Sequence, residues 1–149
     1  MKNMNRKEFL KACSLTCIGG TGLSIFVQGC ASSNYFAQHS VENNRIIINK
    51  REFDVVSKEQ VIKRSYILVK NNQLEFPICI YRFSDTDFTA LYLKCTHQGC
   101  EVQPQGDFLI CPCHGSEYTN QGKVTNPPAE HDLIKYNVSE ANGVIIVQL

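Results

Sequence analysis

Two short stretches of the chain gather cysteine and histidine side chains at close spacing. The first reads CTHQGC over residues 95–100, and the second reads CPCHGSEY over residues 111–118. Thiolates and imidazoles are soft ligands that suit zinc and iron–sulfur clusters. Each stretch offers at least one ligand of each kind, so a site built from both would use two cysteines and two histidines. The sequence therefore predicts a metal centre held between two loops.

The spacing of these side chains bears on which metal they bind. A structural zinc with two cysteines and two histidines is the simplest interpretation, and its paired ligands are usually two to four residues apart. Cys95 and His97 are separated by Thr96 alone, which strains two ligands onto one ion. This spacing suits the edge of a cluster better. One cysteine in each stretch is left over, and in an exported protein such a pair is expected to form a disulfide.

The residues CTH at 95–97 and CPCHGS at 111–116 closely resemble the two motifs of the Rieske iron–sulfur proteins. The resemblance implies one [2Fe-2S] cluster per chain, with one iron bound by Cys95 and Cys111 and the other by His97 and His114. It also implies further roles around the cluster: a disulfide between Cys100 and Cys113, hydrogen-bond donors at Ser116 and Tyr118, and a covering loop at Pro127 and Pro128.

The replacement of two thiolates by neutral imidazoles removes negative charge from a cluster and makes its reduction easier. Rieske centres accordingly have potentials of about −150 to +300 mV, against about −400 mV for plant-type ferredoxins. The two hydroxyl groups and the additional cysteine pair, all present here, predict a centre of the high-potential type.

The elements that must hold these loops are predicted to be short strands over residues 45–149. Runs of β-branched and aromatic residues alternate with turn residues, and the runs are RIIIN, SYILVK, FPICIYRF, FTALYLK, DFLIC, LIKYNV and GVIIVQL. Asn142-Gly143, between the last two runs, is a strong hairpin signal. We expect an all-β domain, a Rieske-like antiparallel β-sandwich with a small cluster-binding subdomain made of the two loops.

Several other side chains are predicted to have ordinary structural positions. Cys79 is expected to be a buried strand residue, and His39 and His131 to be exposed without a ligand role. The aromatic residues expected in the core or at strand edges are Tyr81, Phe83, Phe88 and Tyr92.

The first 29 residues resemble an export signal. Basic residues precede an apolar stretch, and VQGC then resembles a bacterial lipobox, which implies lipidation at Cys30. NRKEFLK, with Arg6-Lys7, resembles the twin-arginine export motif. Removal of residues 1–29 would leave residues 30–44 as a flexible polar tether. We expect an exported lipoprotein that faces the periplasm or cell exterior; a transmembrane anchor helix is the alternative, although the stretch is short for one.

These features together predict one-electron transfer at a membrane. By resemblance, a quinol or a redox protein would be the donor and a cytochrome-type or other redox protein the acceptor, with His114 facing the quinol. The alternatives are the small Rieske subunit of an exported, arsenite-oxidase-like metalloenzyme and a non-redox zinc-binding lipoprotein. A formal net charge of +1 without a basic stripe gives no reason to expect nucleic-acid binding. Substrate turnover by the chain alone is not expected.

Overall fold

The computed structural model describes residues 35–57 and 60–149, and within these it consists almost entirely of strands. The predicted signal segment and Cys30 lie outside the described residues. The strands of the largest sheet are antiparallel in the order β1-β2-β13-β12-β7-β6-β5. Their bounds are β1 His39–Glu42, β2 Arg45–Asn49, β5 Tyr66–Val69, β6 Ile78–Arg82, β7 Phe88–Tyr92, β12 Lys135–Ala141 and β13 Val144–Gln148.

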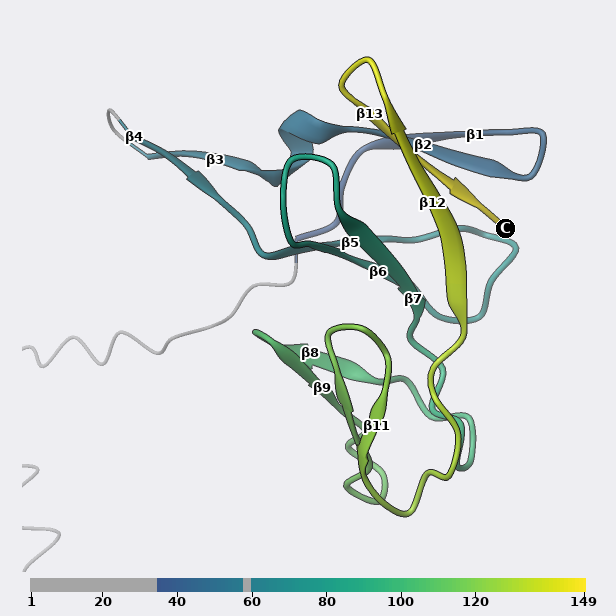
Figure 1. Ribbon diagram of the computed structural model, residues 1–149. Helices are drawn as coiled ribbons and strands as arrows, with labels where there is room; N and C mark the ends of the chain where they lie inside the picture. The colour runs from purple at the N-terminus through teal and green to yellow at the C-terminus, as the bar shows by residue number, and fades with distance from the viewer. Residues whose placement is uncertain (1–34, 58–59) are drawn as a thin grey trace, which may run out of the picture. The chain divides into compact units, whose positions relative to one another are not determined.

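This sheet encloses one apolar core between its two halves, which share β12 (Figure 1). The first residues of β12 pair with β7, whereas the residues from Asn137 onward pair with β13. Just before β1, Phe36 forms a parallel bridge to Leu68 of β5. The segment that leads into one edge strand of the sheet, β1, is therefore bonded to the other edge strand, β5. The core between the halves draws on both of them, with Ile46, Ile48, Ile67, Val69, Ile78, Ile80, Ala90, Ile145 and Val147. The predicted all-β antiparallel fold is confirmed.

A second, four-stranded sheet carries the candidate metal-binding loops (Figure 1). Its order is β11-β10-β9-β8, with β8 Gln103–Gln105, β9 Phe108–Ile110, β10 Glu117–Thr119 and β11 Val124–Asn126. The first ligand loop, residues 95–100, follows β7, and the second ligand loop, residues 111–118, follows β9 and runs into β10.

A second core fixes these loops to the large sheet. All five residues of β7 are buried, which is typical of a strand covered on both faces. One face of β6 and β7 contributes to the first core, and the opposite face packs against the small sheet. The buried side chains of this second core include Cys79, Tyr81, Leu91, Leu93, Val102, Leu109 and Tyr118. The backbone N–H of Val102 also donates to the carbonyl of Leu93 at 2.9 Å. Both ligand loops are therefore attached to a buried core.

The folded domain begins earlier than the sequence predicts. The tether expected over residues 30–44 is wrong for its second part, because β1 pairs along its whole length with β2 and Ala37 is 5% exposed in the first core. Asn43 and Asn44 have φ of +48° and +61° and close a tight hairpin. The side chains of this edge strand are mostly exposed and polar, so it has no apolar pattern that sequence reasoning could detect. The hairpin predicted at Asn142-Gly143 is confirmed by the pairing of β12 with β13.

The remaining hairpin, β3 Asp54–Ser57 and β4 Gln60–Lys63, extends away from the rest of the domain (Figure 1). It follows η1 Lys50–Phe53, a single 3-10 turn. In the part of the chain that the structure describes, no helix is long and apolar enough to cross a membrane.

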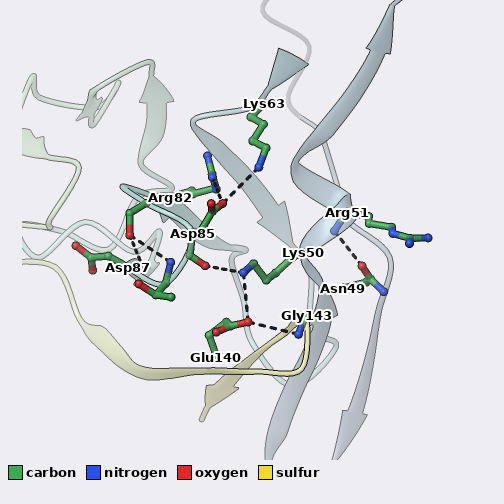
Figure 2. A network of polar contacts seen from close by, with 11 residues as sticks. Asn49, Lys50, Arg51, Lys63, Arg82, Asp85, Asp87, Glu140 and Gly143 are labelled. Carbon is green, nitrogen blue, oxygen red and sulfur yellow. Dashed lines mark hydrogen bonds and ion pairs between the residues drawn. The ribbon is translucent and has the colours of Figure 1, made fainter. Parts of the chain in front are cut away.

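A polar network joins η1 to the β6–β7 loop and to the β12–β13 hairpin, and joins that loop to the end of β4 (Figure 2). The Lys50 ammonium donates to the backbone carbonyl of Asp85 at 2.6 Å and pairs with Glu140 at 3.2 Å. The Asp85 carboxylate accepts hydrogen bonds from Arg82 and Lys63, which hold the pKa of Asp85 below its usual value. Exposed ion pairs of this kind contribute little to stability because water screens them. The network therefore fixes the loop geometry more than it determines the stability of the domain.

Candidate functional site

The two ligand loops have the same backbone hydrogen-bond pattern. In the first, the carbonyl of Cys95 accepts from the N–H of Gly99 at 2.9 Å, and in the second the carbonyl of Cys111 accepts from the N–H of Gly115 at 3.0 Å. The N–H of each of these cysteines donates to the carbonyl five residues later, at 2.8 Å in both loops. Gly99 and Gly115 have φ of +76° and +79°, a region that favours glycine. Two matching turns thus present two cysteines in equivalent positions.

The structure brings the two candidate cysteines together, and likewise the two candidate histidines. Cys95 and Cys111 are 3% and 1% exposed, neither is in a disulfide, and their thiols interact with each other. The ring centroids of His97 and His114 are 5.0 Å apart, and the rings are nearly perpendicular. His97 is partly buried, and His114 is exposed.

The chemistry of these groups fits a cluster with mixed ligation. Nδ1 of His97 is buried and has no hydrogen-bond partner among the described residues. A buried polar atom without a partner costs about 1–3 kcal/mol, so such an atom in a native protein requires an explanation. A metal would give this nitrogen its partner. Two free thiols beside two imidazoles are the donor set of a Rieske [2Fe-2S] centre.

A disulfide joins the two ligand loops. Cys100 and Cys113 are bonded, with Cα atoms 6.6 Å apart, and this is the pair that the resemblance implied. The sulfur of Cys111 lies within 4.8 Å of both sulfurs of the bridge. Because oxidised sulfurs no longer act as thiolate ligands, the bridge supports the site without competing for metal.

Hydrogen-bond donors surround the candidate cysteine ligands. Burial alone would raise the pKa of the Cys95 thiol, but the Tyr118 hydroxyl and the backbone N–H groups of His97 and Gln98 outweigh it, so this pKa is lowered. The pKa of Cys111 is raised, first by burial and then by its neighbour Cys95. Bound metal removes the proton of a coordinating thiol outright. The donors around Cys95 are therefore already placed to stabilise a negatively charged sulfur.

Tyr118 reaches from β10 to the first ligand loop. It is fully buried, and its hydroxyl lies 3.3 Å from Sγ of Cys95. Burial, followed by the contact with Cys95, raises the pKa of Tyr118, so this hydroxyl keeps its proton and can donate it. The structure adds Thr96, which sequence reasoning missed: its N–H lies 3.3 Å and its Oγ1 3.1 Å from the same hydroxyl. The only available signal was its position as the single spacer between two ligands.

Ser116 connects the second ligand loop to the proline segment. Its fully buried hydroxyl accepts from the N–H of Ala129 at 3.0 Å, which leaves its own proton free to donate. Pro127 and Pro128 are joined by a cis peptide bond directly before Ala129. Asn126 also donates to the carbonyl of Gly115 at 3.1 Å. The proline segment is thus attached to the loop that it was predicted to cover.

An open hollow of about 480 Å³ borders this site. Its lining residues are Thr96, His97, Pro128, Glu130 and His131. The hollow lies against His97, whereas the sequence singled out His114 as the histidine facing a donor. His131 is exposed, as predicted, and its backbone carbonyl accepts from Oγ1 of Thr96 at 2.6 Å. Cys79 is fully buried in β6, also as predicted.

Comparisons with known proteins agree with this geometry. Residues 51–137 match the family model of the Rieske [2Fe-2S] domain. The cytochrome b6-f complex iron-sulfur subunit of Chlorobaculum tepidum is 36% identical over 81 residues, which cover 47% of this chain and 45% of that protein. The chloroplastic subunit of Fritillaria agrestis is 47% identical over 58 residues, which cover 36% and 25%. The chain therefore spans less than half the length of these curated relatives.

A solved structure shares the fold. The crystal structure of the cyanobacterial plasma membrane Rieske protein PetC3 from Synechocystis PCC 6803 is similar with a TM-score of 0.51 and 27% identity. The similarity covers 57% of this chain and 87% of that chain.

Proposed function

The chain belongs to the Rieske [2Fe-2S] family, and we propose that it transfers single electrons as an exported, membrane-tethered protein within a quinol-oxidising or other respiratory complex. The observation that carries the proposal is the pair of matching loops, which place two free buried thiols beside two imidazoles. A [2Fe-2S] cluster bound there would supply one-electron redox chemistry. The family match favours this chemistry over a structural zinc.

The residues of the chain would divide the work of holding the cluster. Cys95 and Cys111 would bind one iron, and His97 and His114 the other. Tyr118 donates its proton toward the sulfur of Cys95 and so stabilises negative charge there. Both cysteines are buried, which limits the access of water to the sulfur side of the site.

We propose a quinol or a redox protein as the donor and a cytochrome-type or other redox protein as the acceptor. The printed names of the relatives support this proposal, because they are iron-sulfur subunits of cytochrome b6-f complexes. The surface supports it as well, since His114 is exposed and His97 borders an open hollow. Both imidazoles are therefore reachable from outside the domain.

The proposed lipid anchor at Cys30 would hold the domain close to the membrane. The described fold begins at residue 35, and Phe36 and Ala37 already contact β5 and the first core. A chain spans at most about 3.5 Å per residue, so the interval from Cys30 to residue 35 reaches no more than about 18 Å. The tether would therefore be shorter than the residues 30–44 expected from the sequence, and it would keep the domain close to the lipid surface.

Two measurements test this proposal. Purified holo-protein mixed with a water-soluble quinol should lose visible absorption as it is reduced, with ascorbate reduction as the control for an intact centre. A centre that ascorbate reduces but quinol does not would rule out the quinol as donor. Wild-type protein from a bacterial host should carry a lipid at Cys30 by mass spectrometry, and Cys30→Ser should lack it. A wild-type chain that keeps residues 1–29 and has no lipid would contradict the anchor.

A further inference from the structure

Thr96 lies at the centre of a hydrogen-bond arrangement that connects the first ligand loop, β10 and the segment after the prolines. Its hydroxyl oxygen lies 2.6 Å from the carbonyl oxygen of His131 and 3.1 Å from the hydroxyl of Tyr118. A carbonyl oxygen only accepts hydrogen bonds, so Thr96 must donate its single hydroxyl proton to His131. The oxygen of Thr96 is therefore left as an acceptor on the side that faces Tyr118.

The hydroxyl of Tyr118 consequently has one proton and two acceptors for it. One acceptor is Oγ1 of Thr96 at 3.1 Å, and the other is Sγ of Cys95 at 3.3 Å. The N–H of Thr96 meanwhile donates to the tyrosine oxygen at 3.3 Å, which polarises the O–H bond and makes it a better donor. Because Tyr118 is fully buried, water does not compete with these two acceptors for its proton.

We propose that Thr96 is a positioning residue that weakens the Tyr118–Cys95 hydrogen bond by offering the tyrosine proton a second acceptor. The inference rests on the proposed ligation of iron by Cys95. A hydrogen bond to sulfur stabilises the reduced centre more than the oxidised one, because reduction adds negative charge. The Thr96 hydroxyl therefore lowers the reduction potential below the value that Tyr118 would set without a competitor.

A merely structural role for Thr96 makes a different prediction. The bond to His131 ties the first ligand loop to the segment after the prolines, so its loss would lower thermal stability whatever residue occupies position 118. The competition for a proton, by contrast, exists only while Tyr118 has a hydroxyl group. A double-mutant cycle separates the two roles, since it measures whether the effects of two neighbouring changes depend on each other.

The experiment compares wild-type holo-protein with Thr96→Val, Tyr118→Phe and the double variant. Valine matches threonine in shape, removes only the hydroxyl and keeps the backbone N–H. Thr96→Ser is the matched control, because it retains the acceptor and the bond to His131. The midpoint potential is measured by redox titration of the visible circular dichroism, and thermal unfolding of the cluster-free protein is measured alongside it.

We expect Thr96→Val to raise the midpoint potential, Thr96→Ser to leave it unchanged, and Thr96→Val to cause no shift in the Tyr118→Phe background. A downward shift, no shift, or the same shift in both backgrounds would overturn the inference. If Thr96→Val binds no cluster, Thr96→Ala removes the same acceptor and replaces it in the cycle. Failure of both variants to bind a cluster while Thr96→Ser does so would show that the hydroxyl is needed for assembly, which also contradicts the inference. Wild-type protein without a cluster would refute the proposed function itself.

Discussion

Tyr118→Phe removes a single oxygen atom next to a candidate ligand. The ring is fully buried in the second core beside Leu109 and Val102, and phenylalanine preserves that packing. What is lost is the hydrogen bond to Cys95 at 3.3 Å and the acceptor of the Thr96 N–H. The reduction potential of the cluster should therefore fall, because the reduced centre loses more stabilisation than the oxidised one.

The size of this fall follows from the strength of the bond. A hydrogen bond to a charged group contributes about 1.5–3 kcal/mol, and for one electron about 1.4 kcal/mol corresponds to 59 mV. If the whole benefit belonged to the reduced state, the potential would fall by roughly 65–130 mV. Since Thr96 shares the proton, we expect the lower end of this range, about 65 mV or less.

Potentiometric titration of the purified holo-protein measures this shift. Tyr81→Phe is the matched control, because Tyr81 is 1% exposed in the same core and its hydroxyl bonds to none of the four candidate ligands in the described domain. An unchanged or raised potential in Tyr118→Phe, or a shift no larger than that of Tyr81→Phe, would rule out this role of the Tyr118 hydroxyl.

The other predictions concern the supports of the site. Cys100→Ser/Cys113→Ser should lower the free energy of unfolding by about 3 kcal/mol, as expected for a bridge across 13 residues, and should reduce cluster occupancy; unchanged urea denaturation would contradict this. Gly122→Ala should destabilise the fold by about 2–4 kcal/mol, because a φ of +83° costs a residue with a Cβ about 1 kcal/mol and that Cβ would lie 2.7 Å from the buried Leu91 side chain. Gly106→Ala, with φ of +70° and open space, is its control and should cost only about 1 kcal/mol; equal losses would refute the steric argument. Ser116→Ala should lower the reduction potential, because the second ligand loop loses a hydroxyl group whose proton is free to donate. It should also lower the melting temperature, because the buried Ala129 N–H loses its acceptor; an unchanged melting temperature would argue against that bond.

The sequence was sufficient for the strands and loops whose signals are local. Each apolar run that it marked contains or overlaps a strand, and Asn142-Gly143 turns where its chemistry requires φ above zero. The two ligand loops were found because their residue types are chemically constrained. Such features depend on neighbours in the chain, so they can be predicted without knowing the tertiary fold.

Features that depend on tertiary contacts escaped prediction. β1 has polar, exposed side chains and gains its stability from pairing with β2, so residues 35–44 looked like a tether. The hydrogen bonds of Thr96 could not be predicted either, because its partners Tyr118 and His131 lie 22 and 35 residues later in the chain. The hollow next to His97 is likewise formed by a distant segment, residues 128–131, so the sequence could not predict it; the expectation that His114 faces a quinol came from the family resemblance and stays a prediction.

We propose that Cys95, Cys111, His97 and His114 together hold a [2Fe-2S] cluster. The most direct test is pulsed EPR on dithionite-reduced protein, together with iron and sulfide analysis. We expect about two irons and two acid-labile sulfides per chain, with nitrogen couplings from two histidines. Stoichiometric zinc without visible absorption, or a cluster whose EPR shows no histidine nitrogen, would contradict it.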